Sequence, residues 1–526
     1  MKRVIAYDIG TTGVKTCLFE IDRSIRLIDS ASRKYPLYIL PDGGAEQDGD
    51  DWWKGMADST KEVIERTGID PHTIDGLSFC SQMQGLVLVD KDGVPVHRPM
   101  SYMDQRATEE VKKGMSYGIQ IAGANILKAI PSLIITGAVT SSVKDPVWKC
   151  KWIEAHEPEN FARAYRWLDV KDYLTARCTG RFTMTEDSAF STLICDTRPG
   201  RVGWNKTMNK MFNIREDLLP EIIKSTDLVG PLTAKAAEEL GLAEGTPVFG
   251  GGGDSSLIGV GAGCVKVGDT HIYSGTSGWV ITVVDKQMVD VSAMIAAVTG
   301  ADSGKYNYFA EMETAGKAIE WAKNTFLLDG TGYYTDAEHA EKPDTYNFLC
   351  EAIKDIEPGS GGVIFAPWLH GNRCPFEDPA SVGVFIGAKI ETTKAHMFKA
   401  VVEGVFYHLR WMLECQDKKI KTSDTIRFVG GTALSPLFCQ ILSDILGRKV
   451  ETVESPQNVG SVGAAAVMAV GLGLAKTLTE AASFIPANAT YEPDMEKHAA
   501  YEQYYQAFKK LYKANKDLFK TVKGEN

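Results

Sequence analysis

Alternating apolar and polar positions predict a strand, a tight turn and a returning strand at two widely separated places. Residues 3–10, "RVIAYDIG", and residues 14–22, "VKTCLFEID", are typical of two strands joined by Thr11, Thr12 and Gly13. Residues 269–285, "DTHIYSGTSGWVITVVD", repeat the arrangement around a second Gly-Thr-Ser-Gly turn. We therefore expect one such hairpin in each half of the chain.

Helical periodicity predicts several helices between and after these hairpins. Residues 50–68 carry apolar side chains at helical spacing and end on a glycine, and residues 434–450 place Ser435 at a helix start and Gly447 at its end. Residues 498–518 predict one amphipathic helix near the end of the chain. Residues 462–475 are apolar and small, but too short to span a membrane, so they predict a tightly packed buried helix.

Strands that alternate with helices predict a mixed α/β fold, and 526 residues are too many for one ordinary core. The repeated hairpin favours two related domains that face each other across a central cleft. A run of four glycines begins at Gly250, after an acidic helical stretch. We expect domains at 1–245 and 246–526.

Charge and cysteine content narrow the function classes. The net charge of −11 argues against binding to nucleic acid or to an anionic membrane surface. The ten cysteines form no CxxC pair, which argues against a zinc site or a disulfide framework. An acid as early as Asp8 interrupts any signal-peptide core, so a cytoplasmic location is expected.

The two glycine-threonine turns predict a phosphate-binding element in each half. Backbone N–H groups and hydroxyls in such turns can converge on one anion. The candidates are Gly10, Thr11 and Thr12 in the first turn, and Gly275 and Thr276 in the second. The alternative is that the glycines only permit positive φ in tight turns.

Asp8 and Lys15 flank the first turn. A carboxylate beside a phosphate requires a cation between them, and Mg²⁺ that retains several waters is the simplest choice. Lys15 would add a second positive charge, or it would be a solvated lysine on a strand.

Two further glycine clusters carry candidate chemistry. Four glycines leave the backbone bare before Asp254, whose carboxylate could orient and deprotonate a hydroxyl, or could cap a helix that begins at Ser255. Gly430 and Gly431 follow the predicted strand "IRFV" and would let a flat group lie against the backbone, or would form an ordinary turn between a strand and a helix.

Taken in order, these motifs resemble those of the FGGY carbohydrate kinases, a branch of the actin-like ATPase superfamily. The motifs are Asp8-x-Gly10-Thr11-x-x-x-Lys15, the glycine run with Asp254, Gly275-Thr276-Ser277-Gly278, and Gly430-Gly431-Thr432. Residues 81–107, 146–161, 172–180 and 383–409 are similar to further family segments, and the first of them is similar to the sugar-binding segment of xylulokinases.

The resemblance implies two actin-like, ribonuclease H-like domains with ATP between them and a sugar as the second substrate. It implies phosphate contacts at Thr11, Thr12, Gly275 and Thr276, and adenine near Gly430, Gly431 and Thr432. Asp254 would be the base and, with Asp8, the magnesium ligand. The sugar pocket would be formed by Met83, Gln84, Tyr102, Asp104, Arg106, Asp254 and Ser255. A structural ion pair is the alternative for Tyr102, Asp104 and Arg106.

Three positions depart from the xylulokinase pattern. Gln84 stands where a histidine is usual, Ser255 where an asparagine is usual, and Tyr102 where a tryptophan is usual. Glutamine keeps hydrogen-bonding capacity but cannot become charged, and serine is shorter than asparagine. We therefore expect a sugar pocket that differs from that of typical xylulokinases.

The leading hypothesis is an ATP-dependent kinase for a small ketose, with D-xylulose first. The alternatives are another ketose or polyol (ribulose, L-xylulose, erythritol or glycerol), a sensor that binds sugar and ATP without turnover, or a chaperone-like ATPase. Dimers are common in the family, so a homodimer is also expected.

Overall fold

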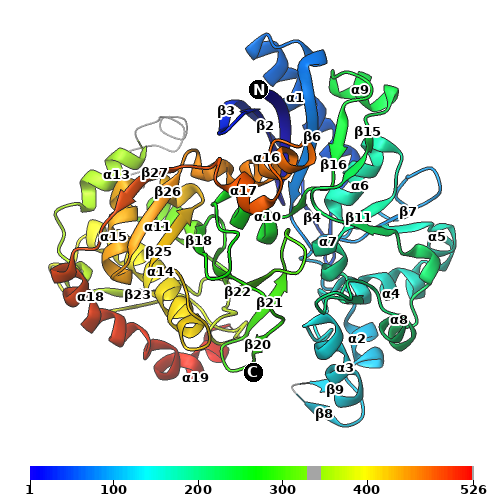
Figure 1. Ribbon diagram of the computed structural model, residues 1–526. Coiled ribbons are helices and arrows are strands. Elements are labelled where there is room, and N and C mark those ends of the chain that lie inside the picture. Colours follow the sequence, from blue (N-terminus) through cyan, green and yellow to red (C-terminus); the bar gives the residue numbers. More distant parts are fainter. Residues whose placement is uncertain (122, 328–344, 524–526) are drawn as a thin grey trace.

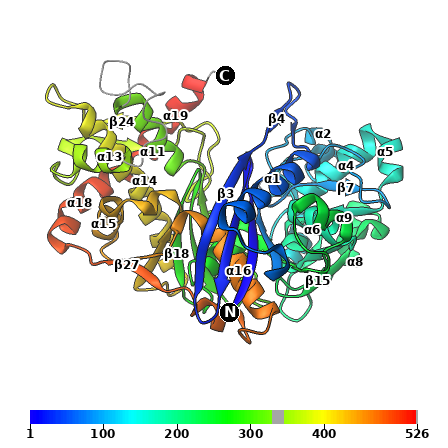
Figure 2. The ribbon, with the colours of Figure 1, turned by 90° about the horizontal axis from the view of Figure 1, so that it is seen from above.

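The computed structural model describes residues 1–121, 123–327 and 345–523. They fold into two lobes, each built around a β-sheet with helices on its faces (Figure 1). Seen from above, the lobes lie side by side, and helix α16 (Val459–Gly471) runs between them (Figure 2). Among the described residues, no helix is both long and apolar enough to cross a bilayer.

The first sheet has the strand order β15-β16-β6-β1-β2-β3, with the short β17 also paired to β6. β1 and β2 form the predicted antiparallel hairpin, and β6 runs parallel to β1. Helix α1 (Gly49–Thr67) packs on β2 and β3 and is capped by Asp48 and Gly68, which confirms the helix predicted there. The strands are β1 (Lys2–Ile9), β2 (Gly13–Ile21), β3 (Ile25–Lys34), β6 (Ile74–Ser81), β15 (Leu228–Pro231), β16 (Pro247–Phe249) and β17 (Gly252–Gly253).

The first sheet continues beyond residue 245, because β16 and β17 both pair with β6. Between them Gly251 adopts φ +69°, and a Cβ there would lie 2.2 Å from the Phe79 carbonyl oxygen. The glycine run thus lets the chain approach β6 closely. The division of the chain at residue 245 stays a prediction, and the last strands of the first sheet follow it.

The second sheet has the order β20-β21-β22-β19-β18-β25-β26-β27. Its hairpin β18–β19 is the second predicted one, and β25 runs parallel to β18 as β6 does to β1. The two sheets therefore share the same central arrangement of three strands. The strands are β18 (Thr270–Ser274), β19 (Gly278–Val284), β20 (Val289–Asp290), β21 (Ile295–Thr299), β22 (Tyr306–Met312), β25 (Thr425–Val429), β26 (Lys449–Val453) and β27 (Ala487–Tyr491).

Helices complete both lobes. The second lobe places α14 (Lys394–Asp417) against its sheet, and α15 (Pro436–Leu446) has the predicted caps Ser435 and Gly447. The remaining helices longer than one turn are α2 (Thr108–Gly114), α3 (Ile126–Thr136), α4 (Pro146–His156), α5 (Pro158–Arg163), α6 (Val170–Thr179), α7 (Glu186–Ser191), α8 (Lys206–Phe212), α9 (Ala234–Leu240), α11 (Gly316–Ala322), α13 (Thr345–Ile353) and α17 (Leu478–Ala482).

The lobes share one hydrophobic core around α16 and α10 (Asp254–Gly261). Val4 of the first sheet and Val429 of the second sheet both belong to it. The two helices pack closely, since a Cβ at Gly463 would lie 2.1 Å from the Leu257 carbonyl oxygen. α16 is the buried helix that the sequence predicts, although it begins and ends earlier than residues 462–475.

The prediction of a single helix over residues 498–518 is wrong. The chain forms α18 (Met495–Phe508) and α19 (Leu511–Lys523), with a turn at Lys509 and Lys510. The turn brings both Phe508 and Phe519 against Trp368, with ring centroids 6.1 and 6.0 Å away. Burial of both rings against the second lobe therefore outweighs helix continuity.

Candidate active site

Hydrogen bonds to its backbone stabilise the first glycine-threonine turn. Gly10 N–H donates to the Gly13 carbonyl at 2.9 Å, and the Tyr35 hydroxyl donates to the Gly10 carbonyl at 2.6 Å. The Gln47 amide donates to the Thr11 carbonyl at 2.7 Å. The Thr12 side chain is exposed. Hydrogen bonds therefore fix the backbone of the turn, while the Thr12 side chain stays exposed.

Asp8 and Lys15 lie opposite each other at the end of the hairpin. Burial raises the pKa of the Asp8 carboxyl, and the nearby Lys15 lowers it. Lys15 Nζ donates to the Gln457 carbonyl at 2.6 Å, just before α16. A Cβ at Gly460 would lie 3.3 Å from Asp8 Oδ2. Lys15 thus joins the two lobes, and its role as a phosphate ligand stays a prediction.

The second turn is also closed by an internal hydrogen bond, although this bond spans two residues and that of the first turn spans three. Gly275 N–H donates to the Ser277 carbonyl at 3.0 Å, and Ala315 N–H donates to the Thr276 carbonyl at 3.1 Å. The Thr276 side chain is exposed, like that of Thr12. Each lobe therefore offers one supported turn with an exposed threonine, in keeping with the sequence pattern.

The Gly430-Gly431 pair lies directly behind the second turn. Gly430 has φ +99°, and a Cβ there would lie 2.5 Å from the Ser274 carbonyl oxygen. Gly431 has open space beside it. The Thr432 hydroxyl, however, is buried and hydrogen-bonded to the Ser274 hydroxyl at 2.9 Å. The pair leaves room for a flat group, while Thr432 ties the turn to β18.

Asp254 is half-buried at the first residue of α10, with Gly253 as the N-cap. The helix therefore begins one residue earlier than the capping alternative required, and the carboxylate accepts from Ser255 N–H at 2.7 Å. Burial raises the pKa of Asp254 to about 7, and the Asp8 and Glu311 carboxylates contribute to the increase. An acid of this kind can accept a proton near neutral pH.

Met83 lies beside Asp254, because the Ser255 hydroxyl contacts the Met83 sulfur at 3.2 Å. A Cβ at Gly253 would lie 2.1 Å from the same sulfur, so the last glycine of the run makes room for Met83. The structure thus brings Met83, Asp254 and Ser255 together, as the sequence predicts.

Gln84, the next residue, has the unusual φ of +61°. Asp169 accepts from the N–H groups of Gln84 and Gly85, each at 3.0 Å, and Lys149 Nζ donates to the Gln84 carbonyl at 2.8 Å. Burial lowers the pKa of Lys149 to about 8 and raises that of Asp169 to about 7. The sequence did not indicate these two residues; Lys149 lies in the family-like stretch 146–161, which marks the segment and not the contact.

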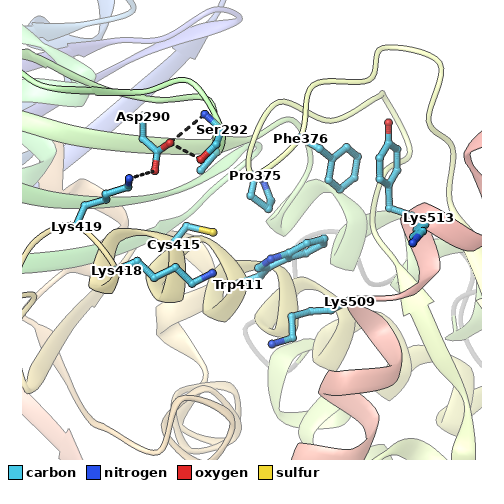
Figure 3. A pocket seen from close by; sticks show the side chains of 12 residues that line it. Asp290, Ser292, Pro375, Phe376, Trp411, Cys415, Lys418, Lys419, Lys509 and Lys513 are labelled. Carbon is cyan, nitrogen blue, oxygen red and sulfur yellow. Dashed lines mark hydrogen bonds and ion pairs between the residues drawn. The ribbon is translucent and has the colours of Figure 1, made fainter.

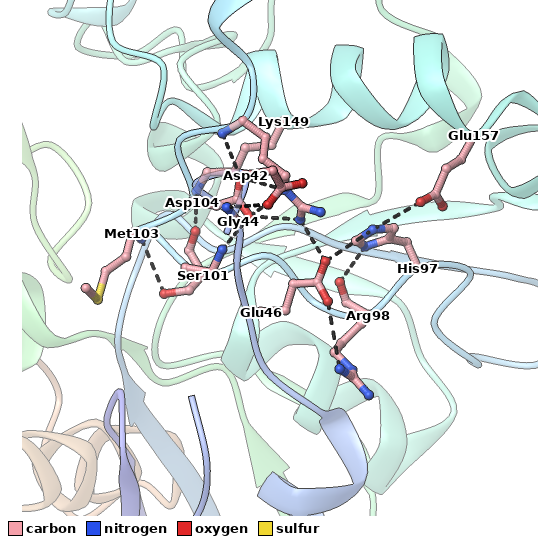
Figure 4. A network of polar contacts seen from close by, with 12 residues as sticks. Asp42, Gly44, Glu46, His97, Arg98, Ser101, Met103, Asp104, Lys149 and Glu157 are labelled. Carbon is pink, nitrogen blue, oxygen red and sulfur yellow. Dashed lines mark hydrogen bonds and ion pairs between the residues drawn. The ribbon is translucent and has the colours of Figure 1, made fainter. Parts of the chain in front are cut away.

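Asp104 and Arg106 form a buried ion pair. Arg106 is 2.8 Å from Asp104 and 2.8 Å from Glu46, and its guanidinium lies 4.4 Å from the ring centroid of Trp152. Figure 4 shows Asp104 and Glu46 within this network. The polar atoms of both residues are engaged in bracing contacts, in line with the ion-pair alternative. Tyr102 is 37% exposed, and its hydroxyl is 3.5 Å from that of Thr11.

Glu311, Glu313 and Arg373 form an ion-pair cluster that the sequence did not indicate. Arg373 is 2.6 Å from Glu311 and 3.5 Å from Glu313. Glu311 contributes to the raised pKa values of Asp254 and Tyr102. The cluster therefore places charge from the second lobe near the predicted base.

A separate pocket of about 490 Å³ lies in the second lobe. Figure 3 shows Trp411 and Phe376 among its walls, with four lysines around them: Lys418, Lys419, Lys509 and Lys513. None of the catalytic, ATP-binding, sugar-binding or metal-binding residues predicted from the sequence lines this pocket.

The described residues contain no group of three or more His, Cys, Asp or Glu side chains arranged to hold a metal. Asp8 and Asp254 are two carboxylates, and Asp8 raises the pKa of Asp254, so a divalent cation between them would relieve their repulsion. Two protein carboxylates suit Mg²⁺ that takes its other ligands from phosphate and water.

Comparison with known proteins agrees with this arrangement over almost the whole chain. A xylulose kinase of Staphylococcus epidermidis is 29% identical over 506 residues, which are 95% of this chain and 95% of the relative. A solved xylulose kinase of Lactobacillus acidophilus has a TM-score of 0.84 at 24% identity, over 99% of this chain and 100% of that chain. A gluconate kinase of Lactobacillus acidophilus has a TM-score of 0.83 at 25% identity, over 98% of each.

These structural neighbours confirm the predicted fold of two actin-like α/β domains. Residues 3–261 match the N-terminal domain of the FGGY family of carbohydrate kinases, and residues 271–472 match its C-terminal domain. The chain therefore belongs to the FGGY family of carbohydrate kinases, which are phosphotransferases with an alcohol group as acceptor.

Proposed function

We propose that this sugar kinase transfers the γ-phosphoryl group of ATP to a hydroxyl of a small ketose, with D-xylulose as the first candidate. The full-length similarity to xylulose kinases supports the substrate. The position of Asp254 supports the chemistry and carries the proposal: a half-buried carboxylate with a raised pKa lies next to Met83, on the predicted sugar side.

Asp254 would orient the attacking hydroxyl and accept its proton as the new oxygen–phosphorus bond forms. The bond from the γ-phosphorus to the bridging oxygen breaks in the same step, and ADP leaves with that electron pair. Because the transition state of phosphoryl transfer is loose, positioning and charge stabilisation contribute more than base strength. The exposed Thr12 and Thr276 would hold the phosphates from opposite lobes.

Mg²⁺ would lie at Asp8 and Asp254, where it would neutralise charge on the phosphates. The open space at Gly431 would take the adenine ring. The Asp104–Arg106 ion pair would support the sugar-binding segment, and Tyr102 would line the sugar pocket. The substrate, the metal and these roles are proposals, as are a homodimer and a cytoplasmic location.

The test is ADP release with Mg-ATP across D-xylulose, L-xylulose, D-ribulose, L-ribulose, D-fructose, glycerol, erythritol and gluconate. We expect one ketose to give the highest kcat/KM. Asp254→Asn should lower kcat about 100- to 10,000-fold, the range expected when a positioned base is lost, with little change in ATP affinity.

Asp58→Asn, an aspartate change on the outer surface of α1, is the matched control and should leave turnover unchanged. Near-normal turnover by Asp254→Asn would refute its role as base. ATP binding without turnover on any sugar would instead support the sensor alternative, and ATPase activity that ignores every sugar would support the chaperone-like one.

A further inference from the structure

Two fully buried charged side chains hold the backbone of the Met83–Gln84 turn. Lys149 and Asp169 are 0% and 2% exposed. Asp169 accepts both N–H groups of Gln84 and Gly85, and Lys149 donates to the carbonyl of Gln84. The N–H and C=O groups of Gln84 and the N–H group of Gly85 are thus each bonded to one of these two charges.

Lys149 also links this turn to a second segment. Its ammonium donates to the Ser101 carbonyl at 2.7 Å, immediately before Tyr102 (Figure 4). One buried cation therefore joins the two segments, 81–85 and 101–106, that the proposed function assigns to the sugar. Asp169 is itself fixed, because the Ser191 hydroxyl donates to it at 3.1 Å and Val170 N–H donates at 2.8 Å.

The burial of Lys149 and Asp169 and the positive φ of Gln84 each make folding less favourable. A buried charge carries a desolvation penalty that hydrogen bonds offset only when the geometry is good. A non-glycine residue at φ +61° adds backbone strain and persists only where the surroundings enforce it. Here both costs fall on one peptide step next to the predicted base.

We propose that Lys149 and Asp169 are positioning residues that hold Gln84 in its left-handed conformation and so set the affinity for sugar. The inference rests on the proposed function of this site. Loss of either charge would let the peptide of Gln84 rotate and move Met83 away from Ser255 and Asp254. Among the described residues, no hydrogen bond or ion pair joins Lys149 or Asp169 to the two glycine-threonine turns of the proposed ATP side, which should be unaffected.

The experiment measures KM for the best sugar and for ATP, with kcat, in Lys149→Met, Asp169→Asn and Ser191→Ala. Lys149→Met and Asp169→Asn should raise the sugar KM at least tenfold and change the ATP KM less than twofold. Ser191→Ala removes one hydrogen bond to Asp169 without altering a charge, so it should fold and raise the sugar KM about two- to fivefold.

Lys399→Met is the matched control. Lys399 is also buried, 4% exposed, but it lies in α14 of the second lobe, where it donates to the Ile356 carbonyl and pairs with Glu403. It should lower the thermal midpoint but leave the sugar KM unchanged. If Lys149 and Asp169 had a purely structural role, all four variants would keep the wild-type sugar KM, or their sugar KM and ATP KM would change equally. Either result would overturn the inference.

The wild-type protein separates this inference from the proposed function. If the wild type phosphorylates a sugar but the variants do not change the sugar KM selectively, the positioning role alone is refuted. No turnover by the wild type on any sugar refutes both.

Discussion

At the scale of single residues, Tyr35 supports the first glycine-threonine turn, which we propose binds phosphate. Its hydroxyl lies 2.6 Å from the Gly10 carbonyl and 3.0 Å from the Gly13 carbonyl. The Thr12 side chain remains exposed. Tyr35 therefore contacts backbone carbonyls of the turn and leaves Thr12 exposed for the proposed phosphate contact.

We expect Tyr35→Phe to weaken ATP binding more than sugar binding. Loss of a buried hydrogen bond that leaves a carbonyl unpaired costs about 1–3 kcal/mol, and the freed turn should raise the ATP KM about three- to tenfold. Steady-state kinetics against ATP at saturating sugar measure this change. Tyr38→Phe is the control, because Tyr38 donates only to Asp51 near the surface; an equal effect of both variants would contradict the prediction.

The residues that act through backbone conformation were the hardest to predict. Asp254 follows four glycines, a local signal that a sequence displays directly. Lys149 has no comparable signal, because nothing nearby in the chain shows that its ammonium will be buried against the carbonyls of Gln84 and Ser101. Those contacts span 65 and 48 residues and depend on the tertiary fold.

At the scale of elements, the buried Glu403 of α14 joins this helix to Gly359 and Ser360. Glu403 is 0% exposed and accepts from the Ser360 hydroxyl at 2.8 Å and from Gly359 N–H at 3.2 Å. Lys399, one turn earlier, is 3.7 Å away. Burial raises the pKa of Glu403 from 4.5 to about 7, although these partners lower it.

This pKa makes stability depend on pH. Between pH 4.5 and 7 the folded chain keeps a proton on Glu403 that the unfolded chain releases, so the free energy of unfolding falls as pH rises through that window. Glu403→Gln stays neutral and lacks this term. The difference in unfolding free energy, wild type minus variant, should therefore fall by about 2 to 3 kcal/mol between pH 5 and 8.

Urea unfolding at the two pH values measures this difference. Glu391→Gln, an exposed change just before α14, should show none of it. Equal pH dependence in wild type and Glu403→Gln would show that the raised pKa has no effect on stability.

Element boundaries were predictable where their signals are local. α1 and α15 end at the glycines that the sequence suggested, since a glycine in the left-handed conformation closes a helix wherever it is packed. The break between α18 and α19 has no glycine or proline, and only the packing of Phe508 and Phe519 around Trp368 accounts for it.

At the scale of the whole molecule, α10 and α16 join the lobes through a core that belongs to both. α16 lies between β26 and β27 of the second sheet along the chain but packs on β1 and β6 of the first. Gly261 and Gly463 allow the contact, because a Cβ on either would lie within 2.1 Å of a carbonyl oxygen on the opposite helix or at its start. Any relative movement of the lobes would therefore have to preserve this helix pair or pivot about it.

We expect Gly463→Ala to destabilise the entire protein. The added methyl group would force the two helices apart at a cost of about 1–3 kcal/mol, the usual range for overpacking. The measurement is thermal unfolding, with Gly203→Ala as control, since Gly203 has only one atom near the position of its Cβ, at 3.9 Å. An unchanged midpoint for Gly463→Ala would show that the helices can separate freely.

The sequence by itself determined the features that follow from local chemistry. Strand periodicity and glycine placement predicted both hairpins, the capped helices and a candidate base at Asp254, and the order of the motifs indicated the family. Only the tertiary structure decided that Lys15 bonds across the lobes, that Lys149 and Asp169 hold Gln84, and that strands after residue 245 complete the first sheet. The physical reason is that hydrogen bonding and burial between distant segments depend on where the folded chain places them, which no local pattern records.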